Sequence, residues 1–116
     1  MECRQRRTLL DKVGPPPAGM DRPHAHHVLP QKGIGPRQQE LVREGRAILE
    51  EHGIDPVEDV ENLTWAPNVQ GQHTTERVEA LVGRLREVNA DPEAGKEEIV
   101  EVLEEYGEIA ANHRSD

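Results

Sequence analysis

Strand-like segments are few and short in this sequence of 116 residues, and each ends at a proline. Residues 24–30 (His-Ala-His-His-Val-Leu-Pro) and residues 62–67 (Asn-Leu-Thr-Trp-Ala-Pro) are the two candidates. Proline has no N–H to donate to a neighbouring strand, so both runs stop where the proline stands. We therefore expect an α+β fold with a small sheet, mostly helical by residue count.

Three other segments carry apolar residues at helical spacing. The first covers residues 36–52, with Pro36 suited to the first turn and Gly53 to the C-terminal cap. The second runs from about residue 74 to residue 88. The third starts at Asp91 as N-cap and continues to near residue 111.

We expect three regions along the chain, around one core, because this length does not support a second core. Residues 1–21 form a flexible segment, since consecutive prolines at 15–17 interrupt it without apolar periodicity. Residues 22–90 form the domain proper, and residues 91–116 form an acidic helix that packs on it. The apolar face of that helix carries Ile99, Leu103 and Tyr106.

The net charge of −9 is divided unevenly along the chain. Residues 1–46 hold nine Lys and Arg against five Asp and Glu, whereas residues 47–116 hold five against eighteen. The first part can therefore meet a phosphate backbone, while the second part repels one. Three arginines of the first helical segment recur near one face and are candidates for phosphate contacts: Arg37, Arg43 and Arg46.

Cysteine content and hydropathy exclude several kinds of site. Cys3 is the only cysteine, so neither an internal disulfide nor a thiolate zinc site can form. Any metal ligands must come from histidine, asparagine or carboxylate side chains. No apolar run approaches the roughly 20 residues that span a bilayer, and no signal-peptide pattern is present. We expect a soluble chain that does not associate with membranes.

Five residues occur in an order that would allow them to form one functional site. His26 and His27 lie on the first strand candidate, Pro30 ends it, Asn62 begins the second, and His73 opens a helix. Each signal is weak alone, because histidine pairs arise by chance and a histidine near a helix start is usually solvated or a cap. Adjacent strand residues point to opposite faces, so both histidines serve one site only where the hairpin bends.

The combination resembles the AHH family of the HNH/endonuclease VII superfamily. Residues 25–30 (Ala-His-His-Val-Leu-Pro) look like its signature, and residues 47–55 resemble its leucine-rich helix and Gly-Ile-Asp turn. Residues 62–67 look like its asparagine strand, and residues 73–74 like the His-Ser/Thr pair that starts its last helix. The resemblance covers about residues 22–89 and is specific in order and spacing.

What the resemblance implies is a small ββα-metal (His-Me finger) core with additional helices. By position, His26 and His73 would be metal ligands, and His27 would be the general base. Asn62 would brace the hairpin or orient His27. The implied cofactor is one divalent metal ion, which could be zinc, nickel, manganese or magnesium.

The third metal ligand stays open. Where the family often has a further histidine, this chain has Val69, which cannot bind metal. Asn68 and Gln72 are the nearest candidates, and a water is the alternative. His24 could share a face with His26, although a solvated residue at the edge of the linker is the ordinary interpretation.

The resemblance implies a metal-dependent endonuclease that hydrolyses nucleic-acid phosphodiester bonds, with DNA rather than RNA as the expected substrate. Many family members form the C-terminal domain of a bacterial toxin and have a cognate immunity protein. We therefore expect a toxin domain that is cytoplasmic or delivered by secretion. The alternative is a catalytically degenerate domain that serves as a metal-held binding module. A third interpretation, a small acidic helical adaptor, is tested by whether His26, His27 and His73 converge.

Overall fold

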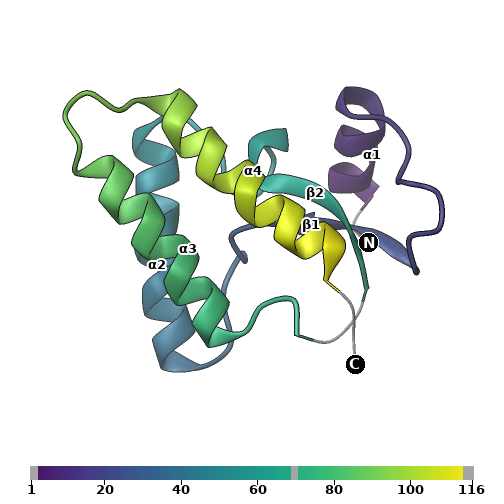
Figure 1. Ribbon diagram of the computed structural model, residues 1–116, viewed down its shortest axis with the longest axis horizontal. Coiled ribbons are helices and arrows are strands. Elements are labelled where there is room, and N and C mark those ends of the chain that lie inside the picture. Colours follow the sequence, from purple (N-terminus) through teal and green to yellow (C-terminus); the bar gives the residue numbers. More distant parts are fainter. Residues whose placement is uncertain (1–2, 69–70, 114–116) are drawn as a thin grey trace.

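The computed structural model describes residues 3–68 and 71–113, and Val69 lies outside them. The described chain forms four α-helices, one short 3-10 helix and two strands (Figure 1). In chain order these are α1 (Cys3–Lys12), β1 (Pro23–His27), α2 (Gly35–Glu51), η1 (Val60–Asn62), β2 (Leu63–Pro67), α3 (Thr75–Asn89) and α4 (Lys96–Asn112). The expected α+β class and the predominance of helix are confirmed.

The two strands pair antiparallel, with Pro23 opposite Pro67 and His27 opposite Leu63. β1 ends at His27, three residues before the expected Pro30. The N–H of Val28 still donates to the carbonyl of Asn62, but the N–H of Leu29 donates to the side-chain oxygen of Asn62 and not to a backbone carbonyl. The strand therefore ends at the histidine pair, and the chain continues towards α2.

α2 and α3 lie within one residue of their expected bounds. Thr74 caps α3 by accepting a hydrogen bond from the N–H of Arg77. α4 begins at Lys96 rather than near Asp91, because the carboxylate of Asp91 accepts from the N–H of Glu93 and forms a turn. The helix starts only after this turn.

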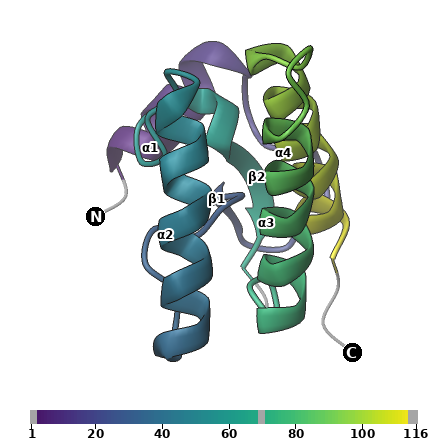
Figure 2. The same ribbon diagram turned by 90° about the vertical axis from the view of Figure 1, so that its left-hand side faces the viewer.

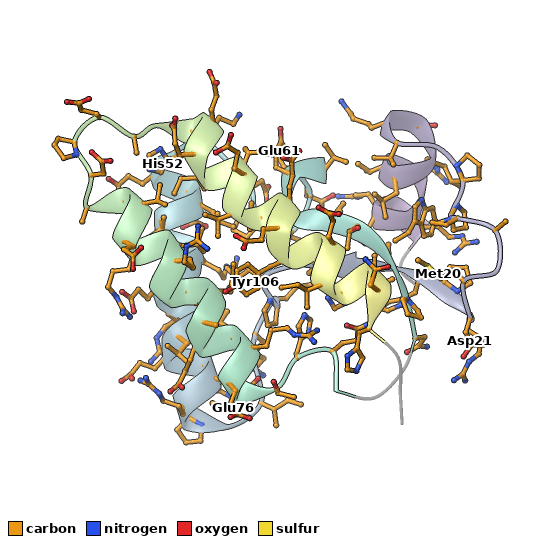
Figure 3. The ribbon with its side chains drawn as sticks, in the orientation of Figure 1. Met20, Asp21, His52, Glu61, Glu76 and Tyr106 are labelled. Carbon is orange, nitrogen blue, oxygen red and sulfur yellow. The ribbon has the colours of Figure 1, made fainter. Side chains whose placement is uncertain are left out.

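The main core lies between the three long helices. α2 and α3 run side by side in the same direction, and α4 packs on α3 and on β2 (Figures 1 and 2). Ile99 and Leu103 of α4 are fully buried here, and Tyr106 packs against the cluster near the centre of the molecule (Figure 3). None of the helices in the described residues has the length and apolar character needed to cross a membrane.

The N-terminal region differs from the expected flexible segment over residues 1–21, because Cys3–Lys12 forms helix α1. Leu9 of this helix is fully buried and joins a second, smaller core with Leu63 and Trp65. The Trp65 indole N–H also donates to the carbonyl of Gly14 at 2.8 Å. One leucine and one indole hydrogen bond thus attach a segment whose basic, proline-interrupted sequence shows no helical stripe.

Candidate active site

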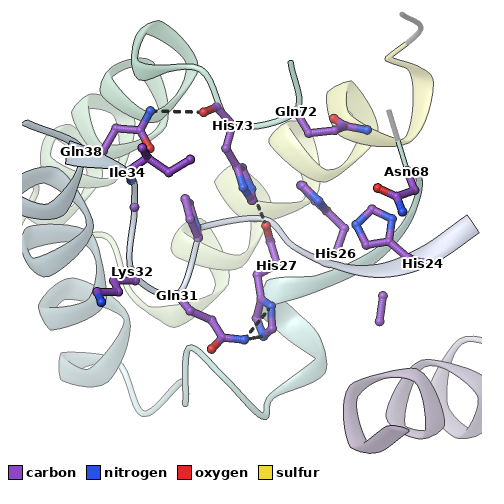
Figure 4. A pocket seen from close by; sticks show the side chains of 13 residues that line it. His24, His26, His27, Gln31, Lys32, Ile34, Gln38, Asn68, Gln72 and His73 are labelled. Carbon is purple, nitrogen blue, oxygen red and sulfur yellow. Dashed lines mark hydrogen bonds between the residues drawn. The ribbon is translucent and has the colours of Figure 1, made fainter. Parts of the chain in front are cut away.

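A hollow of about 510 Å³ opens where β1, the loop after it and the start of α3 meet (Figure 4). Four of the six histidines line it: His24, His26, His27 and His73. Among the described residues of this lining, Lys32 carries the one fixed charge and no carboxylate is present. The hollow therefore offers imidazole nitrogens and amides to a ligand, with a local charge opposite in sign to that of the whole chain.

His26 and His73 meet at this hollow although they are far apart in the sequence. Their rings stack with centroids 4.4 Å apart and planes inclined by 27°. His73 is held by its Nε2, which donates to the carbonyl of His27 at 2.9 Å. A carbonyl only accepts, so Nε2 carries the proton and Nδ1 of a neutral ring keeps its lone pair.

Gln38 of α2 holds the backbone of His73 from the other side. Its amide donates to the carbonyl of His73 at 3.2 Å and to the hydroxyl of Thr75 at 3.0 Å. Its side-chain oxygen accepts from the N–H of Ile34. This buried glutamine is a positioning residue that the sequence analysis missed. The available signal was its place on the apolar stripe of α2, where a polar residue is unusual.

His24 belongs to the same cluster rather than to the solvent. Its ring meets His26 edge-on, with centroids 5.5 Å apart and planes at 86°. Its Nδ1 donates to the carbonyl of Ala66 at 2.9 Å, which leaves the lone pair on Nε2. The two-residue spacing within β1 puts His24 and His26 on one face of the strand.

The His27 ring lies apart from this cluster, towards Gln31 (Figure 4). Its Nε2 donates to the carbonyl of Val57 at 2.9 Å, so Nδ1 carries the lone pair of the neutral ring. The Gln31 amide lies 3.3 Å from Nδ1 and is exposed, which makes it a weak partner. The nitrogen of His27 that carries the lone pair therefore lies beside Gln31, a residue that also lines the hollow.

Asn62 is fully buried beneath the site and binds only backbone. Its Oδ1 accepts from the N–H of Leu29 at 2.8 Å, and its Nδ2 donates to the carbonyls of Leu29 and Pro56 at 3.1 and 2.7 Å. It thus braces the chain that leaves β1 and does not contact His27. Its effect on His27 passes through Pro56, the residue next to the Val57 carbonyl that holds the ring.

Burial dominates the electrostatics of His26. It lowers the pKa of His26 from its ordinary value to about 2, and the neighbouring rings of His73 and His24 act in the same direction. Only 4% of the residue is exposed. His26 is consequently neutral at physiological pH, the form in which imidazole binds a metal.

Burial also lowers the pKa of His73 and of His27, but each is opposed by a backbone carbonyl. The carbonyl of His27 raises the pKa of His73, and the carbonyl of Val57 raises that of His27. Glu58 acts on His27 in the same upward direction. His27 is thus a neutral base whose protonated form has a hydrogen-bond acceptor in place.

The donors present fit a divalent metal by their chemistry. Neither ring nitrogen of His26 hydrogen-bonds to a described residue, and His73 and His24 each donate one N–H to a carbonyl, which is how second-shell groups orient metal-bound imidazoles. Within residues 3–68 and 71–113, no three His, Cys, Asp or Glu side chains are grouped tightly enough to hold an ion. An ion held by these donors would therefore require the rings to rearrange.

Gln72 does not supply a third ligand in this arrangement. Its amide donates to the carbonyls of Pro67 and Ala110, and its oxygen accepts from Arg77 at 3.2 Å. Asn68 is exposed at the rim of the hollow, and its side chain has no hydrogen bond to a described residue. Of the candidates, His24 is the one whose ring contacts His26.

Comparison of the chain with protein-family models, with curated proteins and with solved structures found no match. The resemblance to the AHH family therefore depends on the sequence motifs alone.

Proposed function

We propose that this chain is a metal-dependent nuclease that hydrolyses phosphodiester bonds of nucleic acids, with a ββα-metal core made by β1, β2 and α3. The observation that carries the proposal is that histidine rings at one hollow occupy two different environments. His26 and His73 are stacked and buried together, whereas His27 has its own carbonyl partner and an Nδ1 whose neighbour is the exposed amide of Gln31. A hydrolase that uses one ion needs these two functions side by side.

His27 serves as the general base. Its Nδ1 accepts a proton from the attacking water as the water oxygen forms a bond to phosphorus and the bond to the leaving oxygen breaks. The carbonyl of Val57, 2.9 Å from Nε2, stabilises the imidazolium that results. Rings fixed in this way lose no orientation during the reaction.

His26 and His73 hold the metal ion, and His24 completes the set of imidazole donors. The ion, when bound, stabilises negative charge on the phosphoryl and leaving oxygens. Three neutral imidazoles suit zinc, nickel or manganese better than magnesium, which prefers oxygen ligands. Asn62 keeps the donors in register by bracing the chain on both sides of the hairpin.

A second candidate is a non-catalytic binding module held together by metal. The close stacking of His26 on His73 favours it, because such packing is also what a purely structural pair of histidines adopts. In that case His27 would orient no water, and replacing it would change no activity. The proposed partners of the nuclease are DNA, or RNA, and an immunity protein of a bacterial toxin system.

The deciding experiment measures degradation of plasmid DNA and of RNA with a panel of divalent ions, beside His27→Ala and His52→Ala variants. His52 is a matched control because it binds Asn89 at the C-terminal ends of α2 and α3, away from the hollow (Figure 3). We expect activity in the wild type and in His52→Ala only. A wild type that binds metal and cleaves neither substrate would contradict the proposal and favour the binding module.

A further inference from the structure

A second hollow, of about 220 Å³, adjoins the histidine-lined one. Its lining consists of Gln31, Lys32, Gln39, Val42, Arg43 and Arg46, and it shares Gln31 and Lys32 with the first hollow. Three of these six side chains are cationic, and no carboxylate belongs to either lining among the described residues. The two hollows form one continuous surface free of negative charge.

Two other hollows of the molecule do contain carboxylates. The groove between β2 and α4 is lined by three glutamates, and the one beside α1 is lined by three carboxylates as well as cations. The carboxylates of these two hollows thus belong to neither the histidine-lined hollow nor the one lined by Lys32, Arg43 and Arg46. Since charges beyond about 8 Å are screened at physiological salt, the local cations govern what binds here.

The arginines of α2 fall into two groups according to their ion-pair and hydrogen-bond partners. Arg37 pairs with Glu40 at 2.9 Å and with Glu79 at 3.1 Å, so its charge is neutralised. Arg43 and Lys32 are exposed and make no ion pair or hydrogen bond with a described residue. Arg46 donates only to the carbonyl of Gln31, at 3.0 Å, and keeps its full charge.

We propose that Lys32, Arg43 and Arg46 form a subsite for the phosphodiester backbone of a nucleic-acid strand, leading into the histidine-lined hollow. Arg43 and Arg46 are three residues apart on one helix and face the same side, and Lys32 links them to the hollow. Cations without carboxylate partners bind phosphates and release the counterions condensed on the strand. The inference deepens the proposed nuclease function and rests on it for the choice of ligand.

The test measures binding separately from cleavage. The full chain is titrated, with chelator present, into labelled duplex DNA, single-stranded DNA and single-stranded RNA at several salt concentrations, and fluorescence anisotropy is recorded. For Lys32→Gln and Arg43→Gln, the slope of log affinity against log salt should fall in magnitude by about 0.9 on a duplex or about 0.7 on a single strand. Arg37→Gln, the matched control on the same helix, should keep the wild-type slope.

Both test positions are exposed and unpartnered, so these variants should fold, and circular dichroism checks that they do. Equal slopes for Arg43→Gln, Lys32→Gln and Arg37→Gln would overturn the subsite even if the wild type cleaves DNA. Slopes that fall only for Lys32→Gln and Arg43→Gln, in a chain that never cleaves, would keep the subsite and reject the nuclease. The three oligonucleotides identify which nucleic acid the subsite prefers.

Discussion

His26 and His27 are adjacent in the sequence, but their rings lie in different surroundings on the two sides of β1. On one side, His26 is almost fully buried between His24 and His73, and its ring makes contacts but no hydrogen bond to a described residue. On the other side, His27 is half-buried, donates to the carbonyl of Val57 and has its second nitrogen beside the amide of Gln31. The alternation of side chains along a strand is sufficient to separate two functions.

The difference teaches that burial alone does not assign a histidine its role. Burial lowers the pKa of both rings, but a carbonyl and the carboxylate of Glu58 oppose the shift only at His27. A base needs such an acceptor, because it must hold a proton for part of the reaction. A metal ligand needs only an available lone pair.

The largest effect is expected at His27, where a substitution tests whether the two sides of β1 have separate functions. Replacing it with alanine should reduce the cleavage rate about 10²–10⁴-fold, because positioned proton transfer is lost. Metal affinity should remain nearly unchanged, since the ring lies outside the cluster of His24, His26 and His73. Calorimetry and a plasmid-nicking assay measure the two quantities on the same preparation.

The converse variants, His26→Ala and His73→Ala, provide the control. Each should weaken metal binding, and activity should fall with it. A His27→Ala protein that loses metal binding as strongly as these variants would show that the two sides of β1 form a single unit.

The next effect concerns Asn62, which supports both sides. Asn62→Ala leaves the N–H of Leu29 and the carbonyls of Leu29 and Pro56 without their partners in a buried place. An unsatisfied buried group costs about 1–3 kcal/mol, so the free energy of unfolding should fall by roughly 3 kcal/mol or more. Urea denaturation measures it. Asn68→Ala, at an exposed position, is the matched control, and an equally small loss in both variants would refute the bracing role.

The contribution of His26 to stability is recognised by the direction in which the free energy of unfolding changes with pH. Its folded pKa of about 2 lies below the ordinary value of 6.5, so below pH 6.5 the unfolded chain takes up a proton that the folded chain does not. Stability is therefore complete above pH 6.5 and is lost as pH falls. At about 1.4 kcal/mol per pH unit, this one group removes about 2 kcal/mol between pH 6.5 and pH 5.

The measurement is the free energy of unfolding at several pH values in the presence of chelator, for the wild type and for His26→Phe. Phenylalanine keeps an aromatic ring in contact with His73 but does not titrate. The variant should lose about 2 kcal/mol less than the wild type over this pH range. Parallel curves for the two proteins would show that His26 takes up its proton without unfolding.

Apolar periodicity predicted the fold well where a segment carries a full stripe, as in α2 and α3. It failed for α1, where Leu9 is the one buried side chain among those whose burial is described, and for the start of α4, where Asp91 forms a turn instead of a cap. The burial of Leu9 depends on contacts made after folding, and no local pattern records such contacts. The Asp91 turn is local, but an aspartate can form either a helix cap or a turn.

The sequence likewise predicted some features of the candidate site and not others. The resemblance named His26, His27, Asn62 and His73, but no spacing rule predicts that His26 and His73 stack. His24 was visible through its two-residue spacing from His26, yet its partner Ala66 lies on the other strand. A sequence shows which residues share a face more readily than which faces meet.

The smallest expected effect concerns Gln31 and sharpens the account of what orients His27. Its amide lies 3.3 and 3.4 Å from the two ring nitrogens, whereas the carbonyl of Val57 lies 2.9 Å from Nε2 and is fixed in the backbone. Since a single neutral hydrogen bond contributes about 1 kcal/mol net, Gln31→Ala should lower the cleavage rate less than about fivefold. Gln5→Ala, a half-buried glutamine on α1 that lines neither hollow, is the control for general effects. A loss near that of His27→Ala would mean that Gln31, and not the Val57 carbonyl, holds the base in place.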